Sequence, residues 1–384
     1  MAPVVLELQK YPKRICTCVC VTAQHREMLD QVLEWFRIAP DYDLDLMRPD
    51  QGLADLASRV LVSVSKLLQE VQPDVVLVQG DTTTVMMTAL AAFYQHIPVG
   101  HVEAGLRTRN RYDPFPEEIN RRVDGVLATW HFAPTERAAA ALRAEQVAEE
   151  NIFVTGNTVV NALLMTVQRP VDLKLDLRLN GRRLILVTAH RRESFGAPSE
   201  SLCWALRDLA ERNPDVEVVY PVHLNPKVRE PVGRILTRQP RIHLLESLRY
   251  EQFAHLMARA YLILTDSGGI QEEAPVLGKP TLVMRETTER PEAIEAGTAR
   301  LVGTNRQQIV AEAEPLLYDK ELYRTMAQVG SPFGDGRAAE RIVDILLDRY
   351  VRSRNSVSRP YLNLTLTKAV TQYCREFVIL HSHL

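Results

Sequence analysis

The chain has 384 residues, 46% hydrophobic and 24% charged, which is the composition of a folded globular protein long enough for more than one hydrophobic core. Lys and Arg number 46 and Asp and Glu number 48, and this balance argues against an extended nucleic-acid surface, which needs a basic excess. No apolar run reaches the ~18 residues of a membrane span and no signal peptide opens the sequence, so we expect a cytoplasmic protein that does not enter a membrane.

Three of the five cysteines, Cys16, Cys18 and Cys20, alternate within the apolar run 15–21. Alternate residues of a strand share one face, so these thiols are expected to line one side of a strand. A zinc site would require Cys-x2-Cys spacing and a second ligand pair, and the sequence has neither. We therefore predict ordinary thiols in a reducing compartment, without a metal.

Short apolar runs recur along the chain, each followed by a polar or glycine-containing turn and then by a helical pattern. They are too short for buried helices and are rich in β-branched residues, which favours strands. The predicted strands are 75–78, 97–99, 152–154, 184–187, 216–220, 262–264 and 281–284, and the clearest helices are 53–70, 134–144, 199–212 and 250–260. Continuous apolar strands that alternate with helices predict an α/β fold with parallel sheets covered on both faces.

The chain is expected to form two domains. A polar stretch at 168–181 follows a predicted helix at 159–167, so we place a first domain at 1–168 and a second at 169–335. A helix at about 336–350 is expected to pack back on the first domain. From about 351 to 384 the sequence is serine-rich at first and has no clear amphipathic period, so we predict a poorly ordered or loosely packed tail.

Polar residues follow the predicted strands at the ends where ligands bind in open α/β sheets. The strand-end residues are Asp81, Glu103, His190, His223 and the turn Asp266-Ser267-Gly268-Gly269. A single strand-end aspartate often only caps the next helix. Five such positions in the same register are hard to explain by capping alone, and they predict a binding site.

The turn Ser267-Gly268-Gly269 leads from a strand into a helical pattern. Glycines let backbone N–H groups approach a phosphate, and a helix N-terminus adds partial positive charge. Glu272 and Glu273 follow about one turn later, where a carboxylate can accept the hydroxyls of a ribose. We predict a nucleoside-diphosphate site here, and the alternative is a tight strand–helix turn without a ligand.

Asp81, Glu103 and Glu117 are expected to form the other side of the cleft. Carboxylates that face one cleft repel each other, and this raises the pKa of at least one of them, as acid/base catalysis requires. Glu117 follows Pro116 at the start of a predicted helix. The alternative for Glu117 is that it only contributes favourable charge to the first helical turn.

Taken together, the motifs resemble the non-hydrolysing UDP-N-acetylglucosamine 2-epimerases over about residues 1–350. They are Gly80-Asp81-Thr82-Thr83-Thr84, His101 through Arg107, Pro116-Glu117-Glu118, Thr155 through Thr158, His190 through Glu193, Tyr220 through Pro226, Thr265 through Glu273 and Thr288 through Glu292. The resemblance implies two Rossmann-like, doubly wound domains of the glycosyltransferase-B type with an interdomain cleft, assembled as a homodimer.

The resemblance also implies a reaction. UDP-N-acetylglucosamine and UDP-N-acetylmannosamine interconvert by elimination of UDP to 2-acetamidoglucal and its re-addition, with no nicotinamide or metal cofactor. The implied catalytic residues are Asp81, Glu103, Glu117 and His190. The implied substrate-binding residues are Arg192, His223, Ser267, Gly268, Gly269, Glu273 and Arg290, and a second, activating UDP-N-acetylglucosamine would meet Gln24 and Arg59.

Two departures from the family pattern stand out. The family's first strand and its Gly-Thr-Arg-Pro-Glu turn have no counterpart in this sequence, and the tail from 351 matches no family segment. That strand is central in a doubly wound sheet, so we expect its neighbours to lack pairing partners. The alternatives left open are a hydrolysing epimerase that releases N-acetylmannosamine, a glycosyltransferase of the same architecture, and an inactive UDP-sugar-binding protein.

Overall fold

The computed structural model describes residues 1–22, 26–48, 51–173, 179, 181–191, 195–288, 290–328, 330–356 and 375–381. It contains two compact units, one of Met1–Ala162 with Gly334–Leu384 and one of Leu163–Phe333. The division falls within helix α7 (Thr158–Val167). All strand pairs are parallel in both units, so the predicted α/β class with parallel sheets is confirmed.

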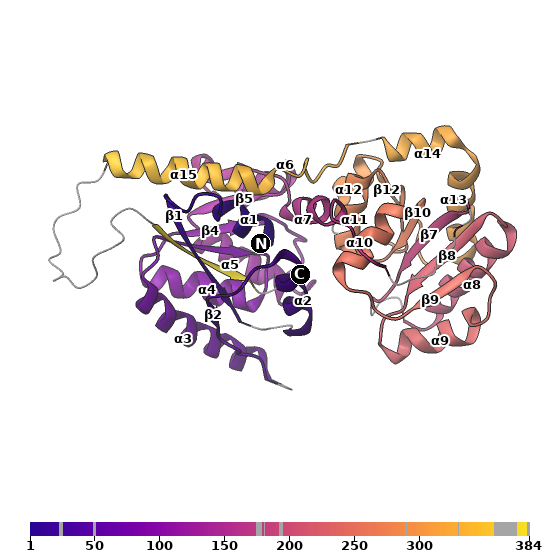
Figure 1. The fold of residues 1–384 in the computed structure, drawn as a ribbon, viewed down its shortest axis with the longest axis horizontal. Helices are drawn as coiled ribbons and strands as arrows, with labels where there is room; N and C mark the ends of the chain where they lie inside the picture. The colour runs from indigo at the N-terminus through magenta and orange to yellow at the C-terminus, as the bar shows by residue number, and fades with distance from the viewer. Residues whose placement is uncertain are drawn as a thin grey trace. The chain divides into compact units, whose positions relative to one another are not determined.

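Unit 1 is built on a seven-stranded sheet in the order β2-β1-β13-β3-β4-β5-β6 (Figure 1). The strands are β1 (Ile15–Val21), β2 (Tyr42–Asp43), β3 (Val75–Gln79), β4 (Val99–Val102), β5 (Trp130–Ala133), β6 (Ile152–Val154) and β13 (Arg375–His381). The helices are α1 (Ala2–Leu8), α2 (Arg26–Phe36), α3 (Leu53–Val71), α4 (Thr83–Tyr94), α5 (Glu117–Leu127), α6 (Glu136–Ala144) and α15 (Ala338–Ser356). Val75 to Val78 of β3 are fully buried, as expected for a strand covered on both faces.

Unit 2 has a six-stranded sheet in the order β12-β11-β10-β7-β8-β9. The strands are β7 (Arg183–Thr188), β8 (Val216–Pro221), β9 (Ile242–Leu245), β10 (Leu262–Thr265), β11 (Thr281–Val283) and β12 (Ala299–Leu301). The helices are α8 (Ala197–Arg212), α9 (Pro226–Leu236), α10 (Tyr250–Arg259), α11 (Gly268–Glu273), α12 (Pro291–Glu295), α13 (Arg306–Tyr318) and α14 (Lys320–Ala327). Helices α8 and α13 contribute to one hydrophobic core with β7, β8 and β10, which fixes the strand ends that carry the site.

Most predicted elements are confirmed, and one strand is shifted. The strand expected at 97–99 begins at Val99 and continues to Val102, so His101 lies within β4 and not after it. Pro98 has no N–H to donate, and its carbonyl accepts the Val76 N–H just before the strand begins. The strands β2, β5, β9 and β12 were not predicted. The cysteine-bearing run is a strand as expected, and Cys16, Cys18 and Cys20 are not in disulfides among the described residues.

The tail contributes a strand at the centre of the unit 1 sheet. β13, the yellow strand in Figure 1, pairs with β1 from Ile15↔Arg375 to Val21↔His381 and with β3 from Phe377↔Val75 to Leu380↔Val78. The expectations that β1 and β3 lack a central partner, and that the tail is a loose appendage, are therefore wrong for residues 375–381. Phe377 to Leu380 is a continuous apolar run, the pattern of a buried parallel strand, and a search for amphipathic periodicity does not detect it.

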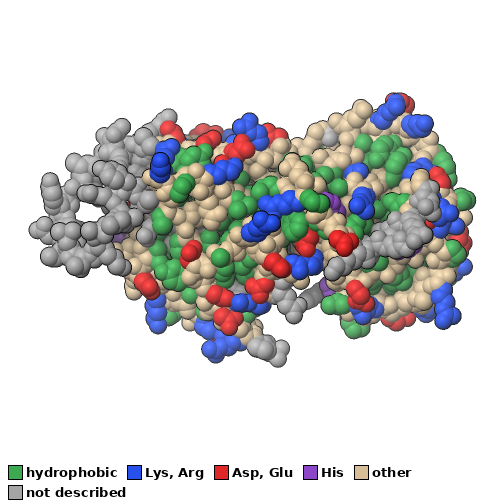
Figure 2. All heavy atoms as spheres, in the orientation of Figure 1, with side chains coloured by type: hydrophobic (Ala, Val, Ile, Leu, Met, Phe, Trp, Pro, Cys, Tyr) green, Lys and Arg blue, Asp and Glu red, His purple; other side chains and the backbone are tan. Residues whose placement is uncertain are grey.

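The described helices include none that is long and apolar enough to cross a membrane. On the face seen in Figure 2, basic and acidic side chains are interspersed over both units and do not gather into a patch of one sign. This distribution agrees with the formal net charge of −2.

Candidate functional site

Two of the predicted catalytic carboxylates follow neighbouring strands of unit 1. β3 ends at Gln79 and β4 at Val102, and these two residues are Cα partners. The Gly80 N–H donates to the Val102 carbonyl over 3.2 Å, which carries the pairing one residue further. Asp81 and Glu103 therefore leave the sheet at the same edge from adjacent strands, as the sequence pattern suggested.

The carboxylate of Asp81 is held by helix α5. Arg121 donates to Asp81 Oδ2 from Nε over 2.8 Å, and its Nη2 lies 2.6 Å from the same oxygen. The Asn120 side-chain amide donates to the Asp81 backbone carbonyl over 2.8 Å. The Arg121 side chain is buried and that of Asp81 is one-quarter exposed, so Asp81 is fixed from one side and open to solvent on the other.

Glu117 is the first residue of α5 and is partly buried. It precedes Arg121 by four residues, and residues at this spacing share one face of a helix. Arg121 contacts Asp81, so Glu117 lies on the side of α5 that faces this strand edge. The next residue, Glu118, is fully buried and accepts the N–H groups of Thr108 (2.9 Å) and Arg109 (3.1 Å), which ties the loop after β4 to α5.

Glu103 adopts a left-handed backbone conformation, with φ +66°. Such a conformation costs a non-glycine residue about 1–2 kcal/mol and recurs at functional sites. The Gln79 side-chain amide donates to Glu103 Oε2 over 3.2 Å. Within β4, His101 Nε2 lies 2.7 Å from the Gly80 carbonyl, and burial lowers the pKa of His101 to about 4, so the ring is neutral and Nε2 is the donor. The turn that carries Asp81 is thus held by an uncharged hydrogen bond.

In unit 2, Asp266 links the ends of β7 and β10. It is fully buried, and its Oδ2 accepts the backbone N–H groups of His190 and Arg191, each over 2.8 Å. Its Oδ1 lies 3.4 Å from His190 Nδ1. A carboxylate with two N–H donors fixes the path of a loop, so Asp266 sets the position from which His190 projects.

His190 and His223 stack at the ends of β7 and β8, with ring centroids 5.7 Å apart and planes 20° apart. Both residues are exposed. Partial burial lowers the pKa of His190, and Asp266 opposes that shift. The two rings form an exposed imidazole surface beside the turn after β10.

The predicted diphosphate turn follows β10 directly. Ser267 is the N-cap of α11, and its N–H donates to Thr265 Oγ1 over 3.0 Å. Gly268 begins α11, and Gly269 is exposed; a Cβ atom at Gly269 would have only the Ser267 hydroxyl as a neighbour, at 4.0 Å. The backbone at Gly269 can therefore be approached closely from solvent.

Glu273, at the end of α11, is buried. Burial, with a smaller contribution from Glu272, raises the pKa of Glu273 to about 8. The Tyr250 hydroxyl donates to Glu273 Oε1 over 3.3 Å. Glu272 instead forms an ion pair with Arg290, whose N–H also donates to Thr288 Oγ1 over 3.0 Å. In this structure Arg290 is thus engaged by Glu272.

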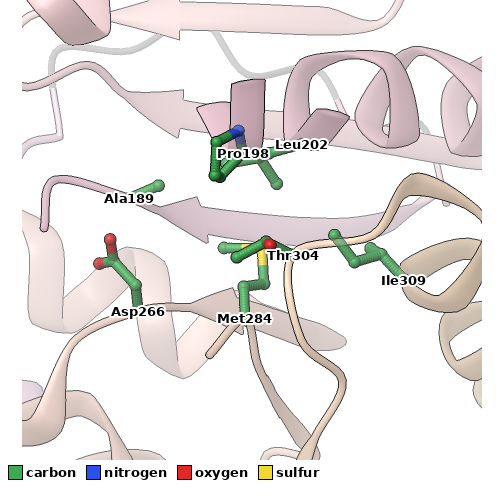
Figure 3. Close-up of a pocket in the computed structure, with 7 residues that line it drawn as sticks. All are labelled: Ala189, Pro198, Leu202, Asp266, Met284, Thr304 and Ile309. Carbon is green, nitrogen blue, oxygen red and sulfur yellow. The ribbon is translucent and has the colours of Figure 1, made fainter. Parts of the chain in front are cut away.

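Asp266 also lines a small, mostly apolar pocket in unit 2 (Figure 3). Its lining residues are Ala189, Pro198, Leu202, Asp266, Met284, Thr304 and Ile309. Figure 3 shows Asp266 at one end of the pocket, with Ala189 above its carboxylate and Met284 to its right. Asp266 Oδ1 is buried and has no hydrogen-bond partner among the described residues. One carboxylate oxygen of Asp266 therefore holds the loop after β7, and the other makes no hydrogen bond among the described residues.

Comparison with known proteins identifies the family to which this chain belongs. Residues 7–347 match the family model for UDP-N-acetylglucosamine 2-epimerase. The UDP-N-acetylglucosamine 2-epimerase of Escherichia coli K12 is 55% identical over 355 residues, which cover 90% of this chain and 94% of that protein. The chain belongs to the UDP-N-acetylglucosamine 2-epimerase family.

Solved structures of this epimerase family agree with the fold. A Listeria monocytogenes homologue has a TM-score of 0.87 at 48% identity, covering 95% of both chains. The Neisseria meningitidis UDP-GlcNAc 2-epimerase bound to UDP-GlcNAc has a TM-score of 0.82 at 47% identity, covering 91% of this chain and 96% of that one. The two Rossmann-like units are those of the family's glycosyltransferase-B-type fold.

The predicted site residues that the structure describes fall into two groups, one in each unit. Asp81, Glu103 and Glu117 belong to unit 1, and His190, His223, Ser267, Gly268, Gly269, Glu273 and Arg290 belong to unit 2. Gln24 and Arg192 lie outside the described residues. Arg59 lies on α3 and donates to Gln51 Oε1. The part of the chain that the structure describes contains no metal-binding group of three His, Cys, Asp or Glu side chains.

Arg121 was not among the residues predicted from the sequence, and Asp266 had no predicted role beyond its place in the turn. Arg121 follows Glu117 by one helical turn, so helical periodicity could have placed it beside the carboxylates. The contact of Asp266 with the loop after β7 depends on β7 and β10 being neighbours. Strand order is not encoded locally, and no signal in the sequence indicates it.

Proposed function

We propose that this enzyme interconverts UDP-N-acetylglucosamine and UDP-N-acetylmannosamine by inverting C2. One carboxylate of the unit 1 group takes the C2 proton, the C1–O bond to UDP breaks, and 2-acetamidoglucal and UDP form. A second group then returns a proton to the opposite face of C2, while the UDP oxygen re-forms the bond to C1. The reaction is an isomerisation without net oxidation.

The observation that carries the proposal is the placement of Asp81 and Glu103 at adjacent strand ends, with Glu117 on the helix that fixes Asp81. Inversion requires groups that can act on both faces of one carbon, and a set of carboxylates from separate elements supplies them. A glycosyltransferase of the same architecture would share the nucleotide site but leaves C2 untouched, so it does not require groups on both faces of that carbon.

The residues of unit 2 are proposed to bind UDP. The Ser267-Gly268-Gly269 turn would receive the diphosphate, and Glu273 would accept the ribose hydroxyls. His190 and His223 would lie beside the diphosphate and stabilise the negative charge that UDP gains when the C1–O bond breaks. Arg290 and Arg192 are proposed as further phosphate contacts.

We also propose that the enzyme is a cytoplasmic homodimer and that a second UDP-N-acetylglucosamine activates it near Arg59 and Gln24. Arg59 Nη1 is buried without a hydrogen-bond partner among the described residues, and an anionic ligand could provide one. Size-exclusion chromatography with light scattering tests the dimer. The activation is tested by measuring the reaction rate against substrate concentration. We expect a sigmoidal curve for the native enzyme and a hyperbolic curve for Arg59→Ala.

The reaction is tested by incubating the enzyme with UDP-N-acetylglucosamine in deuterated water and following products by proton NMR. We expect deuterium at C2 of both UDP-linked sugars at equilibrium, because the abstracted proton exchanges with solvent. Free N-acetylmannosamine and UDP as the only products would establish a hydrolysing epimerase instead. Absence of any C2 exchange would rule out both reactions.

A further inference from the structure

Two buried histidines lie side by side in the unit 1 sheet, next to the strand edge that carries Asp81. His101 of β4 is the Cα partner of His131 of β5, and each residue is 1% exposed. Residues at the same level on neighbouring strands project from the same face of the sheet, so the two imidazole rings are neighbours. In both rings Nδ1 is buried and has no hydrogen-bond partner among the described residues.

The other nitrogen of each ring is bonded to the backbone. His101 Nε2 lies 2.7 Å from the Gly80 carbonyl, in the turn that carries Asp81. The His131 ring donates to the backbone of Ala128, the C-cap of α5. Burial lowers the pKa of both histidines to about 4, so both rings are neutral at neutral pH and each carries one N–H. The backbone carbonyls use these N–H groups, which leaves Nδ1 of each ring as a hydrogen-bond acceptor.

Asp124 of α5 lies between the two backbone contacts. Asn120, one turn earlier in α5, donates to the Asp81 backbone carbonyl over 2.8 Å. Ala128, one turn later, is bonded to the His131 ring. Residues four apart share one face of a helix, so Asp124 is on the face of α5 that carries both contacts. Its side chain is fully buried, and neither carboxylate oxygen has a hydrogen-bond partner among the described residues.

Two arginines lie near Asp124, and both are bonded elsewhere. Arg107 donates from Nε and Nη2 to the two carboxylate oxygens of Glu145. Arg121 contacts Asp81 through Nε and Nη2. Burial, with a smaller contribution from the charge of Asp81, raises the pKa of Asp124 well above its usual range. The carboxyl group therefore keeps its proton and offers one O–H donor.

One water molecule can satisfy the unpartnered atoms of this buried cluster. The two imidazole Nδ1 atoms need donors, and the Asp124 O–H needs an acceptor. A water molecule has two hydrogens and two lone pairs, so it can donate to both rings and accept from the carboxyl group. Internal waters in proteins make about three hydrogen bonds to buried polar groups that would otherwise have no partner.

We propose that His101, His131 and Asp124 hold one buried water molecule and that this cluster positions the turn of Gly80 and Asp81. The water fixes the tautomer of His101, because Nδ1 accepts a hydrogen bond and Nε2 then carries the proton that binds the Gly80 carbonyl. His131 and Asp124 are buried and act through the water, so they are positioning residues. Their effect on turnover rests on the proposed catalytic role of Asp81, whereas the tautomer of His101 does not.

The first test determines the tautomers in the native, full-length protein. Proton–nitrogen correlation NMR of protein with isotope-labelled histidine distinguishes a protonated Nε2 from a protonated Nδ1, and variants that lack His101 or His131 assign the two rings. We expect both rings to be neutral and protonated on Nε2 at neutral pH. A proton on Nδ1 of either ring would overturn the proposal, because that nitrogen could not accept a hydrogen bond from the water.

The second test uses a matched pair of substitutions at Asp124. Asparagine keeps an N–H donor for the water, whereas leucine has a similar shape and no polar atom. In Asp124→Leu we expect His101 to lose its single tautomer and kcat to fall by about 10-fold, less than the ~10²-fold cost of displacing a reacting group by about 1 Å. Asp124→Asn should keep the tautomer and most of the activity. A native His101 spectrum and a native kcat in Asp124→Leu would contradict the proposal.

A second matched pair keeps the proposal testable if Asp124→Leu does not fold. His131→Asn places an amide oxygen near the position of Nδ1 and can still accept from the water, whereas His131→Leu cannot. We expect His131→Asn to keep the His101 tautomer and His131→Leu to lose it, and equal behaviour of the two variants would overturn the proposal. Val126→Ala, at an 85% exposed position of the same helix, is the control and should change neither the tautomer nor kcat.

The water and the role of Asp81 are tested separately. A high-resolution crystal structure should show an ordered water within about 3.2 Å of both Nδ1 atoms, and a direct hydrogen bond from Asp124 to either ring would overturn the bridge. Full activity of Asp81→Asn would show that the proposed role of Asp81 is wrong, and the tautomer of His101 would still stand. Loss of activity in Asp81→Asn together with native activity in Asp124→Leu would reject the positioning role alone.

Discussion

The guanidinium of Arg121 contacts a single carboxylate oxygen of Asp81. Its Nε donates to Oδ2 over 2.8 Å, and its Nη2 lies 2.6 Å from the same oxygen. The Arg121 side chain is only 9% exposed, whereas that of Asp81 is 25% exposed. A buried arginine that holds one edge of a partly exposed carboxylate fixes the direction in which the other edge points. We therefore assign Arg121 as a positioning residue for Asp81.

Arg121→Met should lower kcat by about 10²-fold, because loss of orientation of a reacting group by about 1 Å has this effect. The dissociation constant for UDP should change little, because the proposed UDP site lies in the other unit. Arg121→Lys should recover part of the activity, since a lysine gives a point charge but not the planar fork. Steady-state kinetics and calorimetric titration with UDP measure the two effects separately.

Arg122 is the control on the same helix. Its side chain is 45% exposed and lies 3.4 Å from Glu118, away from Asp81. The buried Glu118 still accepts the Thr108 and Arg109 N–H groups when the half-exposed Arg122 side chain is removed. Arg122→Met should therefore leave kcat within a factor of about 2, as expected for a substitution that does not touch Asp81. If both variants lost activity equally, the cause would be weakening of α5 and not the placement of Asp81.

Asp81→Asn and Glu117→Gln test the acid/base assignment itself. Each should reduce turnover by about 10²–10⁴-fold, the usual contribution of a positioned proton-transfer group. UDP binding should be largely unchanged in both. A large loss of UDP affinity would show that the residue binds nucleotide and does not transfer the proton.

The local part of this fold was accessible from the sequence. Val75–Val78 and Leu262–Leu264 are continuous apolar runs, and both form buried parallel strands whose ends carry Asp81 and Asp266. Such predictions succeed because the strand and the polar residue that follows it are adjacent in the chain. The shift of β4 relative to the predicted 97–99 has a local cause too, the missing N–H of Pro98.

The remainder depends on which distant segments become neighbours. β13 fills a position next to β1, and Asp266 supports the loop of His190 only because β7 and β10 are paired. Likewise, Asp124 of α5 is fully buried, and nothing in the neighbouring sequence indicates this. These relationships follow from topology, and a single sequence without its fold does not specify it.

Asp266→Asn should lower the pKa of the His190 imidazole. In the native protein burial lowers this pKa and the Asp266 carboxylate raises it, so loss of the negative charge removes the opposing contribution. The amide oxygen of Asn can still accept the two loop N–H groups, so the fold should be retained. An NMR titration of His190 measures the change. Glu246→Gln, at an exposed carboxylate of unit 2, should leave it unaltered.

Asp266→Ala removes the acceptor altogether and should destabilise the protein by about 1–3 kcal/mol, the cost of leaving buried donors unpaired. Chemical denaturation measures this loss. An upward shift of the His190 pKa in Asp266→Asn would contradict the assigned electrostatic role.

Asp124→Asn should stabilise the protein at neutral pH. Asp124 is fully buried, both of its carboxylate oxygens lack hydrogen-bond partners among the described residues, and burial raises its pKa well above 3.8. The folded state therefore keeps the proton while the unfolded state releases it above about pH 4, so this group costs stability as the pH rises.

The stability advantage of Asp124→Asn should accordingly be smallest near pH 4 and grow by up to about 1.4 kcal/mol per pH unit above it. Denaturant unfolding at several pH values measures this difference. Asp113→Asn, at an exposed carboxylate of the same unit, should give a difference that hardly varies with pH. A pH-independent difference for Asp124→Asn would show that Asp124 is ionised in the folded protein.

The affinity for UDP should rise as the pH increases through about 8. Burial raises the pKa of Glu273 to about 8, so the unliganded protein carries this carboxyl mostly protonated at neutral pH. Ribose hydroxyls donate more strongly to the ionised form, so UDP binding should release a proton below that pH. Calorimetry in buffers of different ionisation enthalpy measures the release. Glu273→Gln should lose the proton release and bind UDP about 10–100-fold more weakly at high pH, the equivalent of a hydrogen bond to a charged group.

The same raised pKa affects the stability of the free protein. In the unfolded chain Glu273 ionises near its ordinary pKa of 4.5. The stability that its raised folded-state pKa contributes is therefore fully present below pH 4.5 and is lost as the pH rises through about 8. Glu273→Gln should remove this loss, and Glu246→Gln, which is 80% exposed, should not. UDP should offset part of the loss in the native protein but not in Glu273→Gln. If the UDP affinity fell or stayed constant between about pH 7 and 9, Glu273 would not be the residue that accepts the ribose hydroxyls.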